Sequence, residues 1–142
     1  MEFRKATQED LDFVRTNPFE DSMKLYDGSA VPEDNTFTAL FGDEIVGIGG
    51  VQVKWQGRGL LWLIMTETCR KKGLFGIAAL GAIRDKMEDL ISINNLHRAE
   101  AAIRVDFPEA KIMIESFGFR QECIMKQYFI DKSDAYLYVR TT

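Results

Sequence analysis

The chain of 142 residues is poor in cysteine, histidine and proline, with two, one and three of these residues respectively. Cys69 and Cys123 fit neither a disulfide framework nor the spacing of a zinc site, and His97 is the single imidazole. The sequence therefore predicts no metal centre and suits a reducing, cytoplasmic compartment. Cys69 has no histidine partner in view and is interpreted as a packing residue, and His97 as a surface residue without a role.

Long apolar runs and an excess of positive charge are missing too. No apolar run approaches the length of a membrane span, and the start at Met1–Lys5 lacks the core of a signal peptide. The net charge of -4 argues against binding to a phosphate backbone, because such proteins usually present a basic face. We therefore expect one globular domain over residues 1–142, with neither nucleic acid nor a membrane as its partner.

The most informative stretch that is present begins at Leu60. Leu60–Met65 is a continuous apolar run, which is typical of a strand buried on both faces. A short polar segment, three cationic residues (Arg70, Lys71 and Lys72) and Gly73 come next. Apolar residues then recur at spacings of three and four, which predicts a helix. They are Ile77, Leu80, Ile83, Met87 and Leu90.

A strand followed by a turn and a helix is a natural site for an anion. The first N–H groups of the helix are unpaired, its dipole is positive at that end, and glycine permits close approach. A phosphate or pyrophosphate would suit this junction at Arg70–Gly76. The alternative is a solvated turn in which the two glycines only permit the bend.

The other predicted elements complete an ordered pattern along the chain. In chain order they are a strand at Glu2–Ala6, a helix capped by Thr7 with Asp10 in the capping box, a short helix at Phe19–Tyr26, strands at Thr36–Phe41 and Ile45–Val53, a strand at Arg98–Val105, a helix at Pro108–Ser116, and strands at Gln121–Ile130 and Ala135–Arg140. Glycines 47, 49 and 50 lie within one strand, which indicates a bulge or a close backbone or ligand approach, or else loose packing against an aromatic residue.

This order and two motifs resemble the GCN5-related N-acetyltransferase (GNAT) superfamily over nearly the whole chain. Arg70–Phe75 is similar to the family pattern Q/R-x-x-G-x-G/A, with Phe75 in place of a small residue. The second motif, A-x-x-x-Y-x-x-x-G-F, is matched at Ala110, Gly118 and Phe119, whereas Ile114 stands at its tyrosine. The resemblance implies an α+β fold with a mixed, mainly antiparallel central sheet of about six to seven strands and helices on both faces.

The resemblance also implies where acetyl-coenzyme A would bind. In the family, the amides of the glycine-containing turn hold the pyrophosphate, and the pantetheine arm pairs with the fourth strand, which splays from the fifth. The cofactor-binding residues implied by position are Met65, Arg70, Lys71, Lys72, Gly73, Leu74, Phe75 and Gly76.

Catalytic residues are implied less directly. Many members use the motif tyrosine as a general acid, which Ile114 cannot be, and Phe107 replaces a common asparagine. A thiolate with a pKa of about 8.5 can depart without much protonation. By analogy Glu67, and after it Asp106, would serve as the general base through water. The structural alternatives are that Glu67 interacts with Arg70 or the helix start, and that Asp106 caps the Pro108 helix.

The expected function is transfer of an acetyl or other acyl group from coenzyme A to a primary amine of a small molecule or protein, by direct attack in a ternary complex. In the family, the acceptor pocket is built by the early helices and the last hairpin. The aromatic residues Trp55, Trp62, Tyr26, Tyr128 and Tyr136 either line it or belong to the core.

The altered motifs leave other functions open. One is a degenerate GNAT-like module that binds a partner, with a likeness to small GNAT-like proteins of tailed bacteriophages; another is regulatory binding of coenzyme A without turnover. A homodimer through the closing strands is expected if Tyr136–Val139 forms an edge, and not if that segment is tucked into the sheet.

Overall fold

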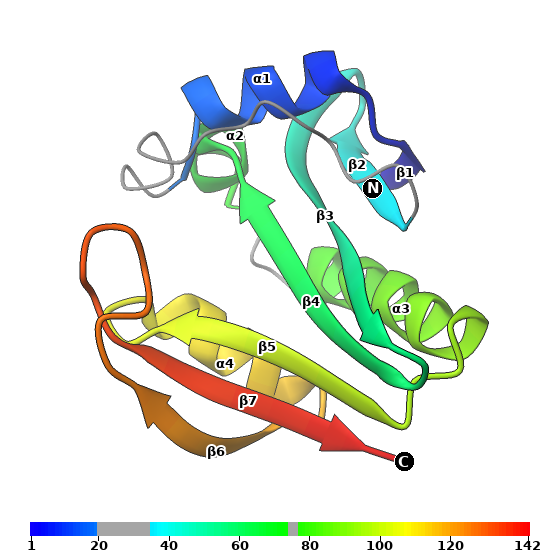
Figure 1. Cartoon of the computed structure of the whole chain (residues 1–142). Coiled ribbons are helices and arrows are strands. Elements are labelled where there is room, and N and C mark those ends of the chain that lie inside the picture. Colours follow the sequence, from blue (N-terminus) through cyan, green and yellow to red (C-terminus); the bar gives the residue numbers. More distant parts are fainter. Residues whose placement is uncertain (20–34, 74–76) are drawn as a thin grey trace.

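The computed structural model describes residues 1–19, 35–73 and 77–142, which form one sheet with helices packed against it (Figure 1). In chain order the elements are β1 (Glu2–Lys5), α1 (Gln8–Thr16), β2 (Thr36–Phe41), β3 (Glu44–Trp55), β4 (Arg58–Met65), α2 (Glu67–Lys71), α3 (Ile77–Ile93), β5 (Arg98–Arg104), α4 (Pro108–Ser116), β6 (Arg120–Met125) and β7 (Ala135–Thr141). The strand order is β1-β2-β3-β4-β5-β7-β6, and every pair except β4 with β5 is antiparallel. The expected fold class is therefore confirmed.

The start of α1 follows the predicted capping box. Thr7 Oγ1 accepts the N–H of Asp10, and the Asp10 carboxylate accepts the N–H of Thr7. The same buried carboxylate also accepts hydrogen bonds from Arg4 and from the Thr38 hydroxyl on β2. One side chain thus caps the helix and fixes it to the sheet.

The glycines of β3 allow neighbouring backbone to come close. A Cβ at Gly49 would lie 2.6 Å from the Trp62 carbonyl oxygen on β4, and one at Gly50 would lie 1.9 Å from the carbonyl oxygen of Asn35. A side chain at either position is excluded by backbone atoms, so the interpretation of a close backbone approach is confirmed.

The parallel strands β4 and β5 pair over a short length and then separate, as Figure 1 shows. Their register runs from Arg58 opposite Arg98 to Leu60 opposite Glu100. At this point the buried carboxylate of Glu100 accepts hydrogen bonds from the guanidinium groups of Arg58 and Arg98. Beyond Leu60 the two strands diverge and leave the sheet open.

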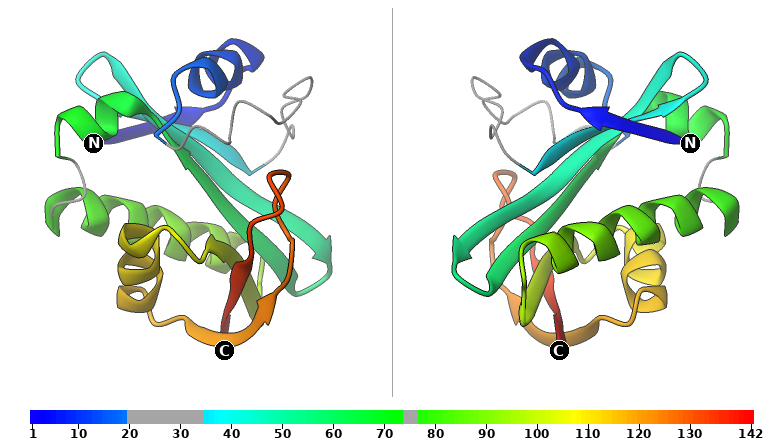
Figure 2. Two further views of the ribbon diagram at one scale, coloured as in Figure 1. Left: turned by 90° about the vertical axis from the view of Figure 1, so that its left-hand side faces the viewer. Right: turned by 90° about the vertical axis from the view of Figure 1, so that its right-hand side faces the viewer.

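The helices cover both faces of the sheet. Met87 and Leu90 on α3 share the largest core cluster with Met113 on α4 and with Phe117 at its C-cap, and Figure 2 shows these two helices on the same side. On the other side α1 places Leu11 and Val14 against β3, and Trp62 and Ile64 of β4 pack against this second cluster.

Two expectations from the sequence need correction, and a third falls largely outside the described residues. Arg70 and Lys71 form the end of the short helix α2, not a turn, since the chain continues helically from Glu67. The strand expected at 121–130 ends at Met125, because the Asp134 carboxylate accepts the N–H of Gln127 and the ammonium of Lys126, which closes a turn. The expected helix at 19–26 falls, beyond Phe19, outside the described residues, as do residues 74–76.

The question left open for Tyr136–Val139 is answered by the strand order. These residues belong to β7, which lies between β5 and β6 and is not an edge of the sheet. The edges are β1 and β6. Within the described residues, no helix is long and apolar enough to cross a bilayer.

Candidate functional site

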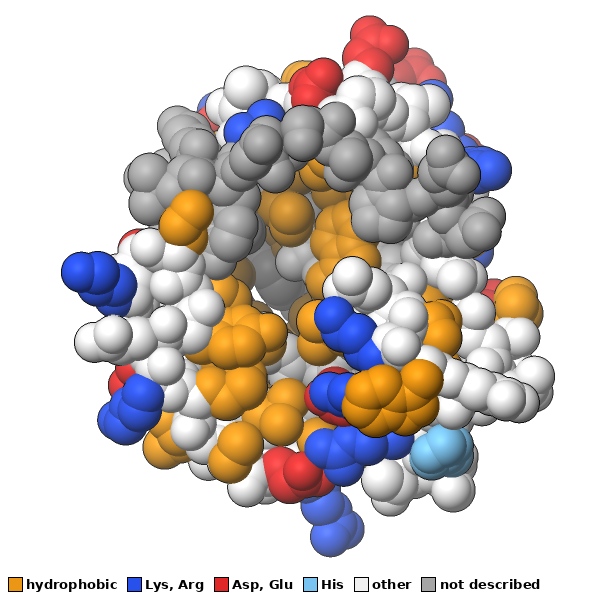
Figure 3. Space-filling model, in the orientation of Figure 1, with side chains coloured by type: hydrophobic (Ala, Val, Ile, Leu, Met, Phe, Trp, Pro, Cys, Tyr) orange, Lys and Arg blue, Asp and Glu red, His pale blue; other side chains and the backbone are white. Residues whose placement is uncertain are grey.

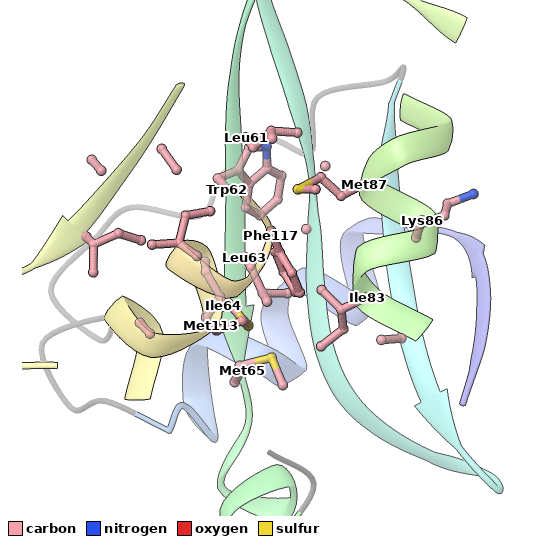
Figure 4. Close-up of a pocket in the computed structure, with 18 of the residues that line it drawn as sticks. Leu61, Trp62, Leu63, Ile64, Met65, Ile83, Lys86, Met87, Met113 and Phe117 are labelled. Atoms are coloured by element: carbon pink, nitrogen blue, oxygen red, sulfur yellow. The ribbon is translucent and has the colours of Figure 1, made fainter. Parts of the chain in front are cut away.

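A cavity of about 210 Å³ lies where β4 and β5 diverge. Figure 4 shows side chains of β4, α3 and α4 around it, and β5 contributes residues 101–104. Figure 3 shows a hollow at the centre of the face seen in Figure 1, bordered by hydrophobic side chains. The lining includes Leu61, Leu63 and Met65 from one face of the sheet and Trp62 and Ile64 from the other, so the cavity passes through the sheet at the splay.

The edge of β4 that faces this opening carries backbone polar groups. Thr66 donates its N–H to Val46 on β3, so the even-numbered residues of β4 turn their N–H and C=O groups toward β3. The odd-numbered Leu61 and Leu63 therefore turn theirs toward the splay. The ladder ends with Leu60 opposite Glu100, a parallel pairing in which Leu61 donates its N–H to the Glu100 carbonyl, so among the described residues the Leu61 carbonyl and both backbone groups of Leu63 lie beyond the last pair of the ladder.

The end of the same edge is already occupied by the segment Asn17–Phe19. Phe19 donates its N–H to the Met65 carbonyl (2.8 Å), and Glu67 donates its N–H to the Asn17 carbonyl (2.9 Å). Pro18 forms an antiparallel bridge with Thr66 between them. This segment is thus a short continuation of the sheet, and Met65, expected to bind pantetheine, already has a partner for its carbonyl.

Phe19 spans the opening between the ends of the splayed strands. Its ring stacks on that of Phe107, with centroids 5.3 Å apart and an interplanar angle of 11°. The Arg70 guanidinium lies 4.0 Å from the centroid of Phe19 and donates a hydrogen bond to its carbonyl (2.9 Å). Arg70, expected in an anion-binding turn, therefore holds Phe19 in place.

The other cations expected to bind pyrophosphate lie at the end of α2. Lys71 pairs with Glu67 (3.6 Å) and Lys72 with Glu44 (3.7 Å), and all four side chains are well exposed. Gly73 has φ +63 and open space where a Cβ would be. Leu74, Phe75 and Gly76 lie outside the described residues. The described part of the turn thus offers weakly paired cations and a backbone open to a ligand.

The two candidate bases lie near the cavity but are not among its described lining. Glu67 is the first residue of α2, and within residues 1–19, 35–73 and 77–142 its carboxylate makes the exposed ion pair with Lys71. Asp106 does not cap α4, whose N-cap is Phe107. Its carboxylate accepts two hydrogen bonds from Arg104, a lining residue.

Around the altered motif positions the cavity is apolar. Ile114 and Phe107 both line it, in places where the resemblance expects a tyrosine and an asparagine. The buried phenol of Tyr138 on β7 donates a hydrogen bond to Glu115 Oε1 (2.7 Å). Burial and this hydrogen bond raise the pKa of Tyr138, and it is not a lining residue.

Cys69 was interpreted as a packing residue and His97 as a surface residue, and the burial of the one and the exposure of the other agree with this. Cys69 is fully buried, and burial raises the pKa of its thiol to about 11, which suits packing and not nucleophilic attack. His97 is exposed beside Gly57. The described residues contain no group of three or more His, Cys, Asp and Glu side chains that could hold a metal ion.

Some residues that line the cavity were not predicted from the sequence. Phe19, Arg104 and Phe129 line it, although they lie in no motif and are far apart in the chain. A sequence signal exists only for Phe19, which follows the helix-breaking pair Asn17–Pro18 and so leaves α1 toward the sheet.

Comparison with solved structures decides the fold. Ard1 from Thermoplasma volcanium superimposes with a TM-score of 0.77 at 19% identity, over 99% of this chain and 97% of that one. The fold is that of the GNAT superfamily. Spermidine N-acetyltransferase from Vibrio cholerae, in complex with CoA and spermine, matches with a TM-score of 0.74 at 15% identity, over 99% and 94% of the two chains. No family model and no curated protein matches the sequence.

The GNAT comparison extends over the whole sheet and its helices, and it confirms the expected resemblance at the level of fold. Several of the similar structures are spermidine N-acetyltransferases, and one of them holds CoA and spermine. The splay of β4 and β5, inferred from the resemblance, is present in this chain with its cavity.

Proposed function

We propose that this protein is a GNAT-type N-acyltransferase that moves an acetyl or other acyl group from coenzyme A to a primary amine. The observation that carries the proposal is the cavity through the sheet, whose β4 edge turns the Leu61 carbonyl and both backbone groups of Leu63 toward it beyond the last pair of the ladder. An extended amide-containing arm can pair with such an edge as an added strand does. The comparison with a CoA-bound acetyltransferase supports this choice of donor.

Transfer in this cavity would be a direct displacement. The neutral amine attacks the thioester carbon, a carbon–nitrogen bond forms, the carbon–sulfur bond breaks, and the thiolate of coenzyme A leaves. The amine loses one proton, which a carboxylate accepts through water, and the thiolate takes up one proton from solvent. An apolar site contributes to the rate chiefly by holding the amine and the thioester close together at the splay.

We propose Glu67 as the carboxylate that receives the proton, with Asp106 as the second choice. Among the described residues Glu67 is held by an exposed pair with Lys71 and can turn toward a bound water, whereas Asp106 is held by two hydrogen bonds from Arg104. Ile114 gives no proton to the thiolate, so the site relies on the low basicity of the leaving group.

Calorimetric titration with acetyl-coenzyme A tests the donor site, with adenosine diphosphate as a control for simple pyrophosphate binding. We expect micromolar affinity, about -8 kcal/mol. Gly73→Asp should abolish it by placing an anion at the turn, and Gly73→Asn is the matched control, since asparagine has the same shape, tolerates φ +63 and adds no charge. Absence of heat and of thermal stabilisation in the wild type would overturn the proposal.

A second candidate is a GNAT-like binding module without turnover. It is favoured by the Met65 carbonyl, which Phe19 already occupies, and by Ile114 at the acid position. Binding of acetyl-coenzyme A without acylation of any amine in a broad screen would support the regulatory form of this candidate. No binding at all would support a partner-binding role.

A further inference from the structure

We propose that the acyl donor is the coenzyme A thioester of a medium-length fatty acid, whose hydrocarbon chain lies in an apolar cleft between α3 and the sheet. This inference rests on the proposed acyl transfer and names the donor class of the same site. It is carried by the part of the cavity that extends from the splay to α3, here called the α3 cleft. In this part, residues of β1, β2 and β3 join the lining: Phe3, Phe37, Ala39 and Gly49.

The floor of the α3 cleft is one face of three neighbouring strands. The register places Phe37 of β2 opposite Gly49 of β3, and Gly49 opposite Leu63 of β4, so the three positions share a face of the sheet. All three line the cavity, and Gly49 adds no side chain between the other two. From β4 to β2 the floor spans two strand spacings, about 10 Å. The α3 cleft therefore leads away from the splay across the sheet.

The roof of the α3 cleft is the inward face of α3. Ile83, Met87 and Leu90 follow one another at spacings of four and three, and all three line the cavity. Figure 4 shows Ile83 and Met87 pointing from α3 toward the labelled side chains of β4. Lys86 also belongs to the lining, but its ammonium points away from the cavity in Figure 4 and lies 3.6 Å from the centroid of the Phe37 ring.

The apolar layer between α3 and the sheet is not closed. Four of its side chains pack against the largest core cluster and are nevertheless only partly buried: Phe37, Leu61, Leu63 and Ile83. Side chains in the middle of a helix–sheet layer are normally packed to high density, with few gaps larger than a water molecule. Apolar surface therefore remains open to solvent in the α3 cleft, and a hydrocarbon chain placed there would remove it from water.

The chemistry of this lining favours a long acyl chain over acetyl. Of the charged residues in the described lining, Lys86 turns its ammonium outward, and Arg104 lies on β5, across the splay from α3. An acetyl group attached to a thiol at the splay would leave the α3 cleft to water. Each methylene group of a longer chain that is buried there should strengthen binding roughly fourfold.

Calorimetry tests this inference by comparing octanoyl-coenzyme A with acetyl-coenzyme A and with coenzyme A itself. Octanoyl has six more methylene groups than acetyl, and we expect its thioester to bind at least about thirtyfold more tightly than that of acetyl. Equal or weaker binding of octanoyl-coenzyme A, with acetyl-coenzyme A still bound, would overturn this inference and leave the acyltransferase proposal standing. Binding of none of the three ligands would overturn both proposals.

Variants of α3 locate the chain. Ile83→Trp fills the α3 cleft and should lower the preference for octanoyl over acetyl, the ratio of the two affinities, at least about tenfold. Ile83→Phe adds less bulk and should lower this ratio by less. Ile93→Trp is the matched control on the same helix, because Ile93 is 73% exposed and lies outside the described lining. The same ratio in Ile83→Trp and Ile93→Trp would overturn the placement of the chain under α3.

Discussion

At the scale of single residues, the two candidate bases differ in how firmly they are held. Asp106 receives two hydrogen bonds from one guanidinium, whereas Glu67 has a single exposed ion pair with Lys71 at 3.6 Å. An exposed pair of this kind contributes little free energy, so Glu67 can leave it at small cost. This difference makes Glu67 the more adaptable carboxylate near the end of β4.

Replacement of Glu67 tests this choice. Glu67→Gln should lower the transfer rate about 100-fold, because the amine loses its proton acceptor, and should leave the affinity for acetyl-coenzyme A unchanged. Steady-state kinetics with calorimetry would separate the two effects. Asp106→Asn is the comparison variant with the same change of carboxylate to amide. Unchanged turnover in Glu67→Gln, or a larger loss in Asp106→Asn, would remove Glu67 from the role.

The two thiols should behave differently toward a thiol reagent. Cys69 is fully buried with its pKa raised to about 11, whereas Cys123 is exposed on β6. We expect one rapidly reacting thiol in the folded protein at pH 8 and two after unfolding, measured with a chromogenic disulfide reagent. Cys123→Ser should abolish the rapid phase, and two rapid thiols in the wild type would contradict the burial of Cys69.

At the scale of elements, the packing of β3 depends on the absence of side chains at its glycines. Gly49 faces the Trp62 carbonyl of β4, and Gly47 lies 3.1 Å, measured from an added Cβ, from the Ile64 carbonyl and the Met65 sulfur. β4 can therefore approach β3 closely while its other edge remains open to the cavity. The elements on either side of the splay thus depend on a strand that is intrinsically weak.

Two glycine substitutions should have opposite effects on stability. Gly49→Ala would push a Cβ against backbone and should lower the free energy of unfolding by about 1–3 kcal/mol. Gly81→Ala lies on α3 with no atom within 4 Å of the new Cβ, and should raise it by about 0.5–1 kcal/mol. Urea unfolding measures both. A stabilising Gly49→Ala would contradict the close approach.

Local signals predicted some elements well. The Thr7–Asp10 box, Pro108 at the start of α4 and the glycines of β3 act within a few residues of their own position, so the sequence contains what determines them. The short helix α2 and the early end of β6 depend on distant partners, Asn17 and Asp134, which no local pattern indicates.

The candidate site was likewise predicted only in part. The splay near Met65 followed from the family resemblance, which carries information about the whole fold. The positions of Phe19 and Phe129 in the cavity did not, since both lie in irregular segments placed by long-range contacts. The general base and the likeness to phage proteins stay predictions, whereas a dimer formed through an edge at Tyr136–Val139 loses its premise, because β7 lies inside the sheet.

At the scale of the whole molecule, two halves of one sheet meet at a short parallel ladder. Only Arg58–Leu60 pairs with Arg98–Glu100, and the buried Glu100 carboxylate lies between the two guanidinium groups at that place. This cluster fixes the point from which the strands diverge. The geometry of the cavity therefore depends on a charge at its base.

Stability should depend on the protonation of Glu100. The hydrogen bond from Arg58, followed by that from Arg98, lowers the pKa of Glu100 in the folded state. Its contribution is thus present above the unfolded pKa of about 4.3 and is lost as the pH falls through the lower folded value. Glu100→Gln should lower the free energy of unfolding at pH 7 by about 2 kcal/mol and flatten its dependence below pH 4.3.

Urea unfolding between pH 7 and pH 3 measures this effect. Glu122→Gln removes the exposed partner of Arg98 and is the matched control, for which we expect a smaller change. Equal losses in the two variants would contradict a special role for the buried carboxylate.

The hydrogen bond from Phe19 to Met65 has a consequence for how any ligand enters. A strand-like ligand that reaches the end of β4 must replace a hydrogen bond that the chain already makes with itself, so the number of hydrogen bonds at that position does not rise on binding. Its affinity must then come from apolar contact deeper in the cavity and from hydrogen bonds to the Leu61 carbonyl and to the backbone groups of Leu63. The rate at which a ligand enters would be limited by how often the hydrogen bond between the Phe19 N–H and the Met65 carbonyl opens.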